Sequence, residues 1–264
     1  MAHPPLQTLD AALEHGAVPV LTWEPWRAPR TDEQSSPAVQ QPGYSLFAIA
    51  AGDHDEHIRT WAQELRQWDR DVVLRFAHEM NGDWYPWGAG VQGNTAEHYV
   101  QAWHHVRNVF DTTGADNVRW CWAPNVPNGL TTENSSTLAD FFPGAAAVDL
   151  LGLDGYIWGP TGPIGWIGAP ALFRTGIREL RTLDTGLPIL ITETASAEAP
   201  DSAAAKAAWI TELFAYADSQ GDVRAIIWFH LDKELDWRID SSPRSQAAYH
   251  HAVTRLRQHP GNGT

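Results

Sequence analysis

The stretch "LRFAHEMNGDWYPWG", residues 74–88, begins as a buried strand and ends as a polar and aromatic cluster. Leu74 and Phe76 suit a hydrophobic interior, whereas His78 and Glu79 follow directly at the end of the apolar run. Burial of a carboxylate disfavours its charged form, so a glutamate at the end of a buried strand needs a reason to be there. Its position indicates either a functional carboxylate or a structural ion pair.

Short and nearly continuous apolar runs recur along the chain, which is typical of parallel strands that are buried on both faces. The expected strands are Val18–Trp23, Val72–Phe76, Val118–Ala123, Leu150–Tyr156, Pro188–Thr194 and Ala225–His230. Amphipathic helices are predicted between most of them, and one helix is expected to begin at a capping box of Asp53 and Glu56. Alternating strands and helices predict an α/β fold with a parallel sheet.

Two forms of such a sheet compete. A doubly wound nucleotide-binding sheet needs a glycine-rich turn, and the chain contains no G-x-G-x-x-G. A (β/α)8 barrel instead carries its functional residues at the carboxyl ends of many strands. Residues of this kind at or just past the expected strand ends are Glu24, His78, Glu79, Asn125, Asp154, Tyr156, Glu193 and His230. The sequence therefore predicts a (β/α)8 TIM barrel that forms a single domain over residues 1–264.

The number of strands is lower than a closed barrel requires. Six strands are convincing, and the first follows a helix-like stretch, "LQTLDAALEHG", at residues 6–16. The segment Pro25–Gly43 is rich in Pro, Gln and Ser and is expected to be a long loop. A barrel with six strands would have two exposed parallel edges, which predicts poor stability or association.

Composition excludes several classes of function. The 264 residues are 43% hydrophobic, which is enough for one substantial core. The formal charge of −14 argues against binding to nucleic acid or an anionic membrane. Lone Cys121 excludes a disulfide within the chain, and neither a membrane-spanning run nor a signal peptide is visible. We expect a monomer without a cofactor.

Fourteen tryptophans are more than a hydrophobic core requires. The indole ring has a large apolar face and a polar edge, which suits both core packing and stacking on sugar rings, so roughly half are expected to line a groove.

Glu79 and Glu193 are the best candidates for a catalytic pair, since each ends a buried strand. Glycoside hydrolysis requires one carboxyl group that holds a proton and a second one that is ionised. An isolated strand-end glutamate could instead pair with an arginine such as Arg75. Because Trp, His and Asn flank the glutamates on separate strands, the catalytic pair is the favoured interpretation.

Other chemistries find less support. The segment "HEMNG" lacks the second histidine of H-E-x-x-H, because Gly82 occupies that position. The histidine pairs at 54/57, 104/105 and 250/251 fall on predicted helices and are expected at the surface. The serine-hydrolase motif G-x-S-x-G is absent. No metal site is predicted.

Several motifs together resemble glycoside hydrolase family 26. They are "LRFAHEMNGDWYPWG", "VRWCWAPNV", "VDLLGLDGYIWG", "PILITETAS" and "AIIWFHLDKELDWRIDSS", and the resemblance extends from Val18 to Ser242. This family consists of (β/α)8-barrel enzymes that cleave β-linked polysaccharides with retention of configuration. Most act on β-1,4-mannans, and some cut mixed-linkage β-glucan or β-1,3-xylan.

The resemblance implies roles for individual residues. Glu79 would be the general acid/base at the end of the fourth strand, and Glu193 the nucleophile at the end of the seventh. His78 would help to position the nucleophile, with Tyr156 beside it and Trp228 as the platform under the sugar. Trp84 and Trp87 would line the leaving-group side. Trp23, Glu24 and Trp26 are expected either to shape the subsites on the opposite side or to form a rim of packing contacts and surface ion pairs. Contacts to the substrate or to its binding residues are expected from Asn125 and Asp154, and a loop near the site from Asp236, Trp237 and Arg238.

This strand numbering leaves the first two strands of the family without a counterpart, and we expect the chain to be truncated at its N-terminus. Truncation would also explain the missing signal peptide, since an enzyme that acts on polymeric glycans works outside the cell. The favoured function is a retaining endo-β-mannanase with a β-linked polysaccharide as substrate. The alternatives are an endo-β-glucanase, a β-1,3-xylanase and a non-catalytic glycan-binding barrel.

Overall fold

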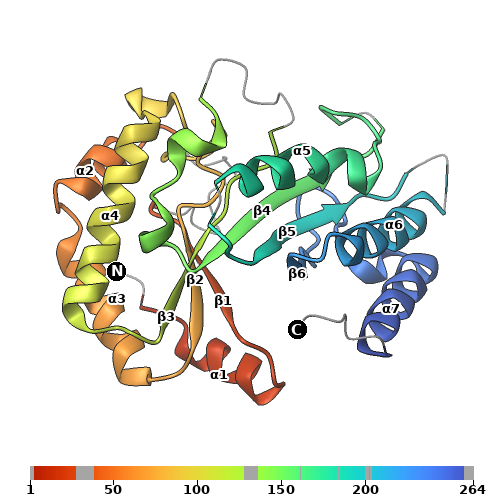
Figure 1. Cartoon of the computed structure of the whole chain (residues 1–264), viewed down its shortest axis with the longest axis horizontal. Helices are drawn as coiled ribbons and strands as arrows, with labels where there is room; N and C mark the ends of the chain where they lie inside the picture. The colour runs from red at the N-terminus through yellow and green to blue at the C-terminus, as the bar shows by residue number, and fades with distance from the viewer. Residues whose placement is uncertain are drawn as a thin grey trace. The chain divides into compact units, whose positions relative to one another are not determined.

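The computed structural model describes residues 3–27, 39–127, 136–160, 162–183, 185–199, 202 and 204–258. These residues form six β-strands and seven α-helices, which alternate over much of the chain (Figure 1). The chain divides into two compact units. Unit 1 consists of Met1–Pro124 and Thr131–Leu150, and unit 2 of Asn125–Leu130 and Leu151–Thr264.

Unit 1 contains three parallel strands in chain order, β1 (Val20–Trp23), β2 (Val72–Phe76) and β3 (Val118–Trp122). All five residues of β2 are buried, as its continuous apolar run predicts for a central parallel strand.

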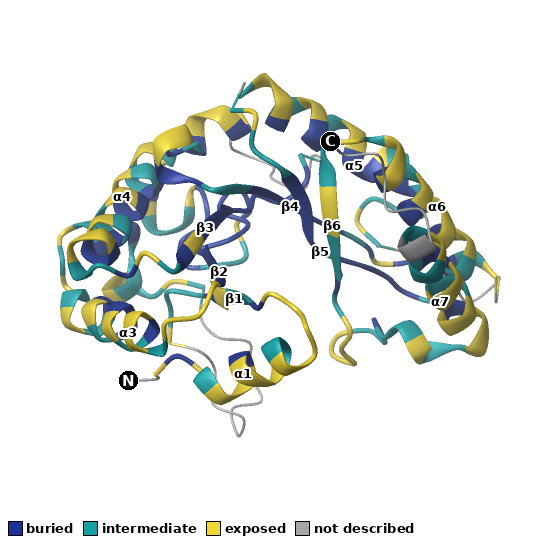
Figure 2. Ribbon diagram, turned by 60° about the horizontal axis from the view of Figure 1, so that its bottom comes forward, coloured by how far each residue is buried: buried dark blue, intermediate teal, exposed yellow. Residues whose placement is uncertain are grey.

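The helices of unit 1 are α1 (Leu6–Glu14), α2 (Leu46–Ala50), α3 (Asp55–Trp68) and α4 (Ala96–Thr113). Short 3-10 turns occur at Pro42–Tyr44, Val91–Gly93, Leu138–Phe141 and Ala145–Ala147. In Figure 2, α3 and α4 are each buried along one side and exposed along the other. The predicted apolar stripe of α3 is confirmed, since Ile58, Trp61 and Leu65 are buried.

The predicted capping box at Asp53 is wrong. Helix α3 begins at Asp55, and its N-cap, His54, makes no side-chain capping bond. Gly52 adopts a left-handed conformation with φ of 90°, and its carbonyl accepts a hydrogen bond from the backbone N–H of Asp55. Asp53 therefore belongs to the turn that precedes the helix and lies too early to cap it.

Unit 2 contains the strands β4 (Leu150–Ile157), β5 (Ile189–Ser196) and β6 (Val223–Trp228), which are parallel and pair in chain order. Its helices are α5 (Ala169–Thr182), α6 (Ala205–Ser219) and α7 (Pro243–Gln258), with a 3-10 turn at Ile239–Ser241. Strand β6 begins and ends two residues earlier than predicted, because Val223 already pairs with Ile189. His230 consequently lies beyond the strand.

Helices α5 and α6 bury the predicted apolar stripes. In α5, Gly176 permits close packing on β4, since a Cβ at this position would lie 2.8 Å from Leu153 Cδ2. The mostly buried strands β4 and β5 contrast with β6, where Arg224 and Ala225 are exposed (Figure 2). In the described part of the chain, β6 pairs with β5 and with no further strand.

These elements confirm an α/β fold with parallel strands and the helix predicted at the start of the chain. The closure of an eight-stranded barrel stays a prediction. Most of the predicted loop Pro25–Gly43, residues 28–38, lies outside the described residues. Among the residues that are described, no helix is long and apolar enough to cross a membrane.

Candidate active site

The backbone after β2 has an unusual conformation at Ala77 and Glu79. Both are non-glycine residues with positive φ, 45° and 53° respectively, a region that L-residues adopt at an energetic cost. Hydrogen bonds to neighbouring strands stabilise it: the N–H of Ala77 donates to the Trp23 carbonyl at 3.0 Å, and that of Glu79 to the Ala123 carbonyl at 2.8 Å. Such strain concentrates at functional sites, and here it sets the position of the Glu79 side chain.

The Glu79 carboxylate is paired with Trp84, a residue predicted to line the site. The indole Nε1 of Trp84 donates to Glu79 Oε2 at 2.7 Å, and Glu79 is 6% exposed. Gly82 makes room for this contact, since a Cβ at Gly82 would lie 2.4 Å from Trp84 Cζ2. The sequence "EMNGDW" therefore allows the indole to fold back over the glycine and reach the carboxylate.

Trp87, the other predicted wall on the leaving-group side, is fully buried. Its ring is stacked on Tyr85 with centroids 4.3 Å apart, and its Nε1 donates to the backbone carbonyl of His78 at 2.7 Å. Trp26 packs edge-on against the same ring at 5.9 Å. Trp87 thus supports the backbone that carries His78 and Glu79, and half-buried Trp84 is the more accessible of the two walls.

His78 is buried beside Glu24, with 4.0 Å between His78 Nε2 and Glu24 Oε1. Burial, together with the nearby charge of Arg75, holds the pKa of His78 well below its usual range. The imidazole is therefore neutral near pH 7 and can both donate and accept a hydrogen bond. Glu24 also accepts a hydrogen bond from Trp26 Nε1 at 3.0 Å, so these two predicted residues lie together.

Trp23 does not support the sugar contact predicted for it. Its ring lies flat on Trp61 of α3, with centroids 4.6 Å apart and an interplanar angle of 6°. Phe76 and Phe110 of α4 pack on it as well. The side chain is 8% exposed and belongs to the aromatic core between the strands and helices of unit 1.

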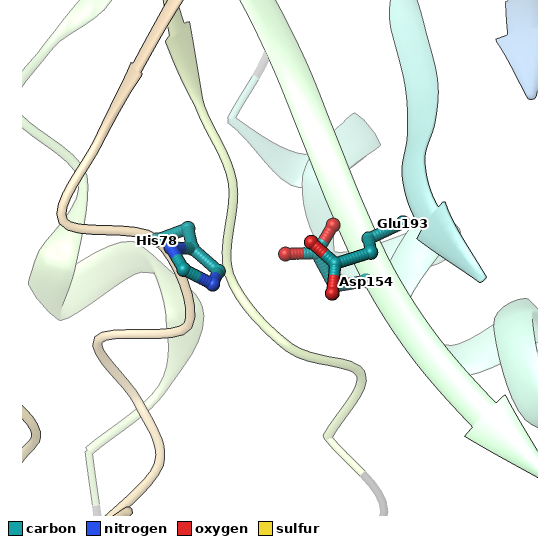
Figure 3. A group of neighbouring side chains, drawn as sticks. All are labelled: His78, Asp154 and Glu193. Carbon is teal, nitrogen blue, oxygen red and sulfur yellow. The ribbon is translucent and has the colours of Figure 1, made fainter. Parts of the chain in front are cut away.

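In unit 2, Tyr156 of β4 and Glu193 of β5 are joined directly, because the tyrosine hydroxyl donates a hydrogen bond to Glu193 Oε1. Asp154 pairs with Glu193 directly after a shift in strand register between Leu153 and Asp154, and Figure 3 shows their carboxylates close together on neighbouring strands. A carboxylate oxygen of Asp154 and one of Glu193 lie within 4.8 Å of each other. Asp154 is fully buried and accepts a hydrogen bond from Thr192 Oγ1 at 2.6 Å.

Asn125 forms a parallel bridge with Asp154, and the following residue, Val126, donates its N–H to the Asp154 carbonyl at 2.8 Å. The structure thus brings Asn125, Asp154, Tyr156 and Glu193 together within unit 2.

Trp228, the predicted platform, ends β6 and is 8% exposed. Its Nε1 donates to the backbone carbonyl of Trp237 at 2.8 Å. The ring of Trp237 in turn packs on Tyr156 with centroids 5.3 Å apart. Trp228 therefore fixes the loop that follows β6 against the tyrosine that binds Glu193.

The sequence does not predict the buried position of Lys206 in α6 or its contacts with the loop after β6. It is fully buried, and its Nζ donates to the carbonyls of Asp236 and Arg238 and to Ser241 Oγ, at 3.2, 2.8 and 2.9 Å. Burial lowers the pKa of Lys206, while acidic neighbours, first among them Glu198, oppose that shift. The available signal was a single lysine in the otherwise apolar segment "AAAKAAWI".

These features define an α/β protein with carboxylates just after β2 and within the parallel strands β4 and β5. Its fold is similar to that of a β-mannanase from Bacteroides ovatus, with a TM-score of 0.63 and 18% identity over 97% of this chain and 72% of that one. An endo-β-1,4-mannanase double mutant from Cellulomonas fimi gives a TM-score of 0.68 at 18% identity, covering 94% of this chain and 56% of the other. At these identities the likeness concerns the fold alone.

The sequence gives the family. The model of glycosyl hydrolase family 26 matches residues 10–166, more than half of the chain, and the chain belongs to this family. Endoglucanase H of Acetivibrio thermocellus is 36% identical over 249 residues, which cover 92% of this chain and 25% of that protein. A mannan endo-1,4-beta-mannosidase of Bacillus subtilis is 32% identical over 102 residues, 36% of this chain and 25% of its own length. The chain thus spans about a quarter of the length of these relatives.

Proposed function

We propose that this chain is the catalytic part of a retaining, endo-acting glycoside hydrolase that cleaves β-1,4-mannosidic bonds in mannan-type polysaccharides. One observation carries the proposal: each of the two strand-end glutamates is held by an aromatic hydrogen-bond donor. Trp84 Nε1 donates to Glu79, and the Tyr156 hydroxyl donates to Glu193. Such donors orient a carboxylate without adding a competing charge.

In the proposed reaction, the Glu193 carboxylate attacks the anomeric carbon while Glu79 gives its proton to the departing glycosidic oxygen. The products of this step are a covalent glycosyl-enzyme and a free sugar hydroxyl. Glu79, now ionised, takes a proton from water, and the hydroxide attacks the anomeric carbon and releases Glu193. The two inversions give net retention, and the mechanism requires the carboxyl groups to lie about 5–5.5 Å apart.

His78, Trp228 and Asp154 have supporting roles in this proposal. A neutral His78 can hydrogen-bond the nucleophile without protonating it, which is consistent with its lowered pKa. Trp228, which is 8% exposed, is proposed to contact the sugar at the reaction centre through the accessible part of its ring. Asp154 pairs with Glu193 after the register shift, accepts a hydrogen bond from Thr192 and so aligns the middle of β5, where Glu193 lies.

The proposal includes the fold at a finer level. We assign β1 to β6 as strands three to eight of a (β/α)8 barrel within a single domain, so that β2 and β5 are the fourth and seventh. Two positions support this assignment: Glu79 lies just after β2, and Glu193 lies within β5. A polymeric glycan as substrate further implies action outside the cell.

A second candidate is an endo-β-glucanase that acts on mixed-linkage glucan. The observation that favours it is the match to endoglucanase H, which covers 92% of this chain, whereas the mannosidase match covers 36%. A xylanase is a further alternative, since "Beta-1,3-xylanase TXYA" of a Vibrio species is 31% identical over 111 residues.

The release of reducing sugar from β-1,4-mannan, mixed-linkage β-glucan and β-1,3-xylan tests the proposal. Wild-type protein should act best on mannan, Glu193→Ala should lose turnover, and exposed Glu14→Ala should behave as wild type. A preference for glucan or xylan would select that alternative. If wild type and Glu193→Ala bind glycans equally and neither releases sugar, the chain is a binding module.

A further inference from the structure

Trp158 stands apart from the other tryptophans of the chain. Nine of the fourteen are buried, and Trp158 is 39% exposed, directly after the end of β4. A single exposed apolar residue needs no explanation by itself, so its surroundings must decide whether it has a role.

The surroundings connect Trp158 to Glu193. Trp158 follows Tyr156 by two residues, and both rings pack on Trp237, with centroids 4.9 and 5.3 Å away. Both therefore lie on the same side of the chain, as the two-residue period of an extended strand requires. Since Tyr156 also binds Glu193, a row of aromatic rings extends from the proposed nucleophile to the exposed indole.

The loop after β4 holds Trp158 in place. Gly162 lies against it so closely that a Cβ would be 2.5 Å from Trp158 Cβ. The N–H of Gly162 donates to the carbonyl of Gly159 at 3.1 Å, and Gly159 has a φ of 97°, which favours glycine. This glycine turn packs on the base of the side chain and leaves the indole accessible.

Trp237, on which Trp158 leans, is itself fixed. Its carbonyl accepts the Trp228 indole N–H, and Lys206 binds the carbonyls of the residues before and after it. The indoles of Trp158 and Trp237 meet at 88°, and a perpendicular contact cannot cover both faces of the two rings. Trp158 is therefore an exposed ring on a base held by hydrogen bonds and ring packing, a geometry in which stacking of a flat ligand requires little prior ordering of the indole.

The charge of the surrounding surface limits the kind of ligand that can bind beside Trp158. The loop after β6 contributes four acidic side chains close to Trp237 in sequence, Asp232, Glu234, Asp236 and Asp240. Two cations of the same loop offset part of this charge: Arg238 binds Asp236 through two hydrogen bonds at 2.8 and 2.7 Å, and Lys233 Nζ lies 2.9 Å from Glu234 Oε1. Four acidic side chains against two basic ones leave the loop with a net negative charge. An acidic surface disfavours an anionic ligand and accepts a neutral one.

We propose that Trp158 is the stacking platform of an additional subsite, which binds a neutral pyranose ring of the glycan chain beyond the ring held at Glu193. This inference rests on the proposed function and specifies its substrate as a chain of uncharged sugars, long enough to reach Trp158.

The test uses uncharged β-linked oligosaccharides of increasing length, from the glycan that wild type cleaves best. Trp158→Ala should raise KM for the long oligosaccharides about 10-fold and leave kcat unchanged. The reason is that stacking away from the reacting bond stabilises the bound substrate and the transition state equally. The shortest cleaved oligosaccharide should show no difference. Trp158→Phe should recover most of the affinity, and Phe47→Ala, which removes another exposed aromatic, should match wild type.

If Trp158→Ala raised KM equally at every oligosaccharide length, or at none, the subsite proposal would be overturned. Hydrolysis of the oligosaccharides by wild type would in that case still support the proposed function. If wild type cleaves none of them, the proposed function fails, and a length-dependent change in tryptophan fluorescence that Trp158→Ala abolishes would preserve the subsite. Sedimentation provides a further check. A dimer that Trp158→Ala converts to monomer, with unchanged KM, would make this face a contact between copies and contradict the proposal.

Discussion

The hydroxyl of Tyr156 donates a hydrogen bond to Oε1 of Glu193, and so links side chains of β4 and β5 near the point where Asp154 and Glu193 pair. A tyrosine in this position orients the carboxylate that we propose as the nucleophile. The hydrogen bond should therefore matter more to catalysis than to folding.

Tyr156→Phe removes the donor and retains the ring that packs on Trp237. Hydrogen bonds to charged groups contribute about 1.5–3 kcal/mol, so kcat/KM should fall between about 10-fold and 150-fold. Steady-state kinetics on the preferred glycan measures this loss. Tyr216→Phe on the outer helix α6 is the matched control, and an equal loss there would contradict a specific role for Tyr156.

Glu79→Ala should separate acid catalysis from the other steps. In a glycoside whose aglycone is a good leaving group, the aglycone departs without being protonated, so the rate of the glycosylation step should be nearly unchanged. The rate of polysaccharide hydrolysis should fall by about 100-fold or more. Glu193→Ala should abolish the cleavage of both substrates, because no nucleophile remains. If Glu79→Ala affected both substrates equally, Glu79 would not be the acid.

Gly82→Ala tests how the local sequence positions Trp84. The added methyl group would occupy space 2.4 Å from Trp84 Cζ2 and should move the indole away from Glu79. Its effect on kcat/KM for polysaccharide should match that of Trp84→Phe, about 10-fold, as expected for one lost hydrogen bond to a carboxylate. The double variant should be no worse than either single one, and additive losses would contradict the shared mechanism.

His78 makes stability depend on pH. Its pKa in the folded protein is well below 6.5, so below about pH 6.5 the unfolded chain binds a proton that the folded protein does not. Stability should decrease as the pH falls, by up to about 1.4 kcal/mol per pH unit from this residue. Urea unfolding of His78→Gln should show a flatter dependence than wild type, whereas exposed His104→Gln should not. Parallel curves for wild type and His78→Gln would refute the account.

Lys206→Met should loosen the loop after β6. It leaves two backbone carbonyls and Ser241 without their donor in a buried place, which costs about 1–3 kcal/mol in the free energy of unfolding. Exposed Lys233→Met, on the same loop, should change stability by less than about 0.5 kcal/mol. Thermal unfolding measures both, and equal effects would contradict the role of Lys206.

The six strands could be predicted because parallel strands buried on both faces require continuous apolar runs. The conformation after β2 could not, since positive φ at Ala77 and Glu79 is not signalled by either residue type. Trp23 was assigned to the site because it ends a strand, but the ring contacts that place it in the core come from α3 and α4. Lys206 was missed because a lysine in a helix is ordinarily a surface residue.

The most direct test of the central claim, double displacement at Glu193, is the anomeric configuration of the first product. Proton NMR in the first minutes of the hydrolysis of a soluble β-1,4-linked oligosaccharide distinguishes the two anomers before mutarotation mixes them. The account predicts that the β-anomer appears first and that Glu193→Ala releases none. An α-anomer as the first product would mean a single inversion and would contradict the assignment of Glu193 as nucleophile.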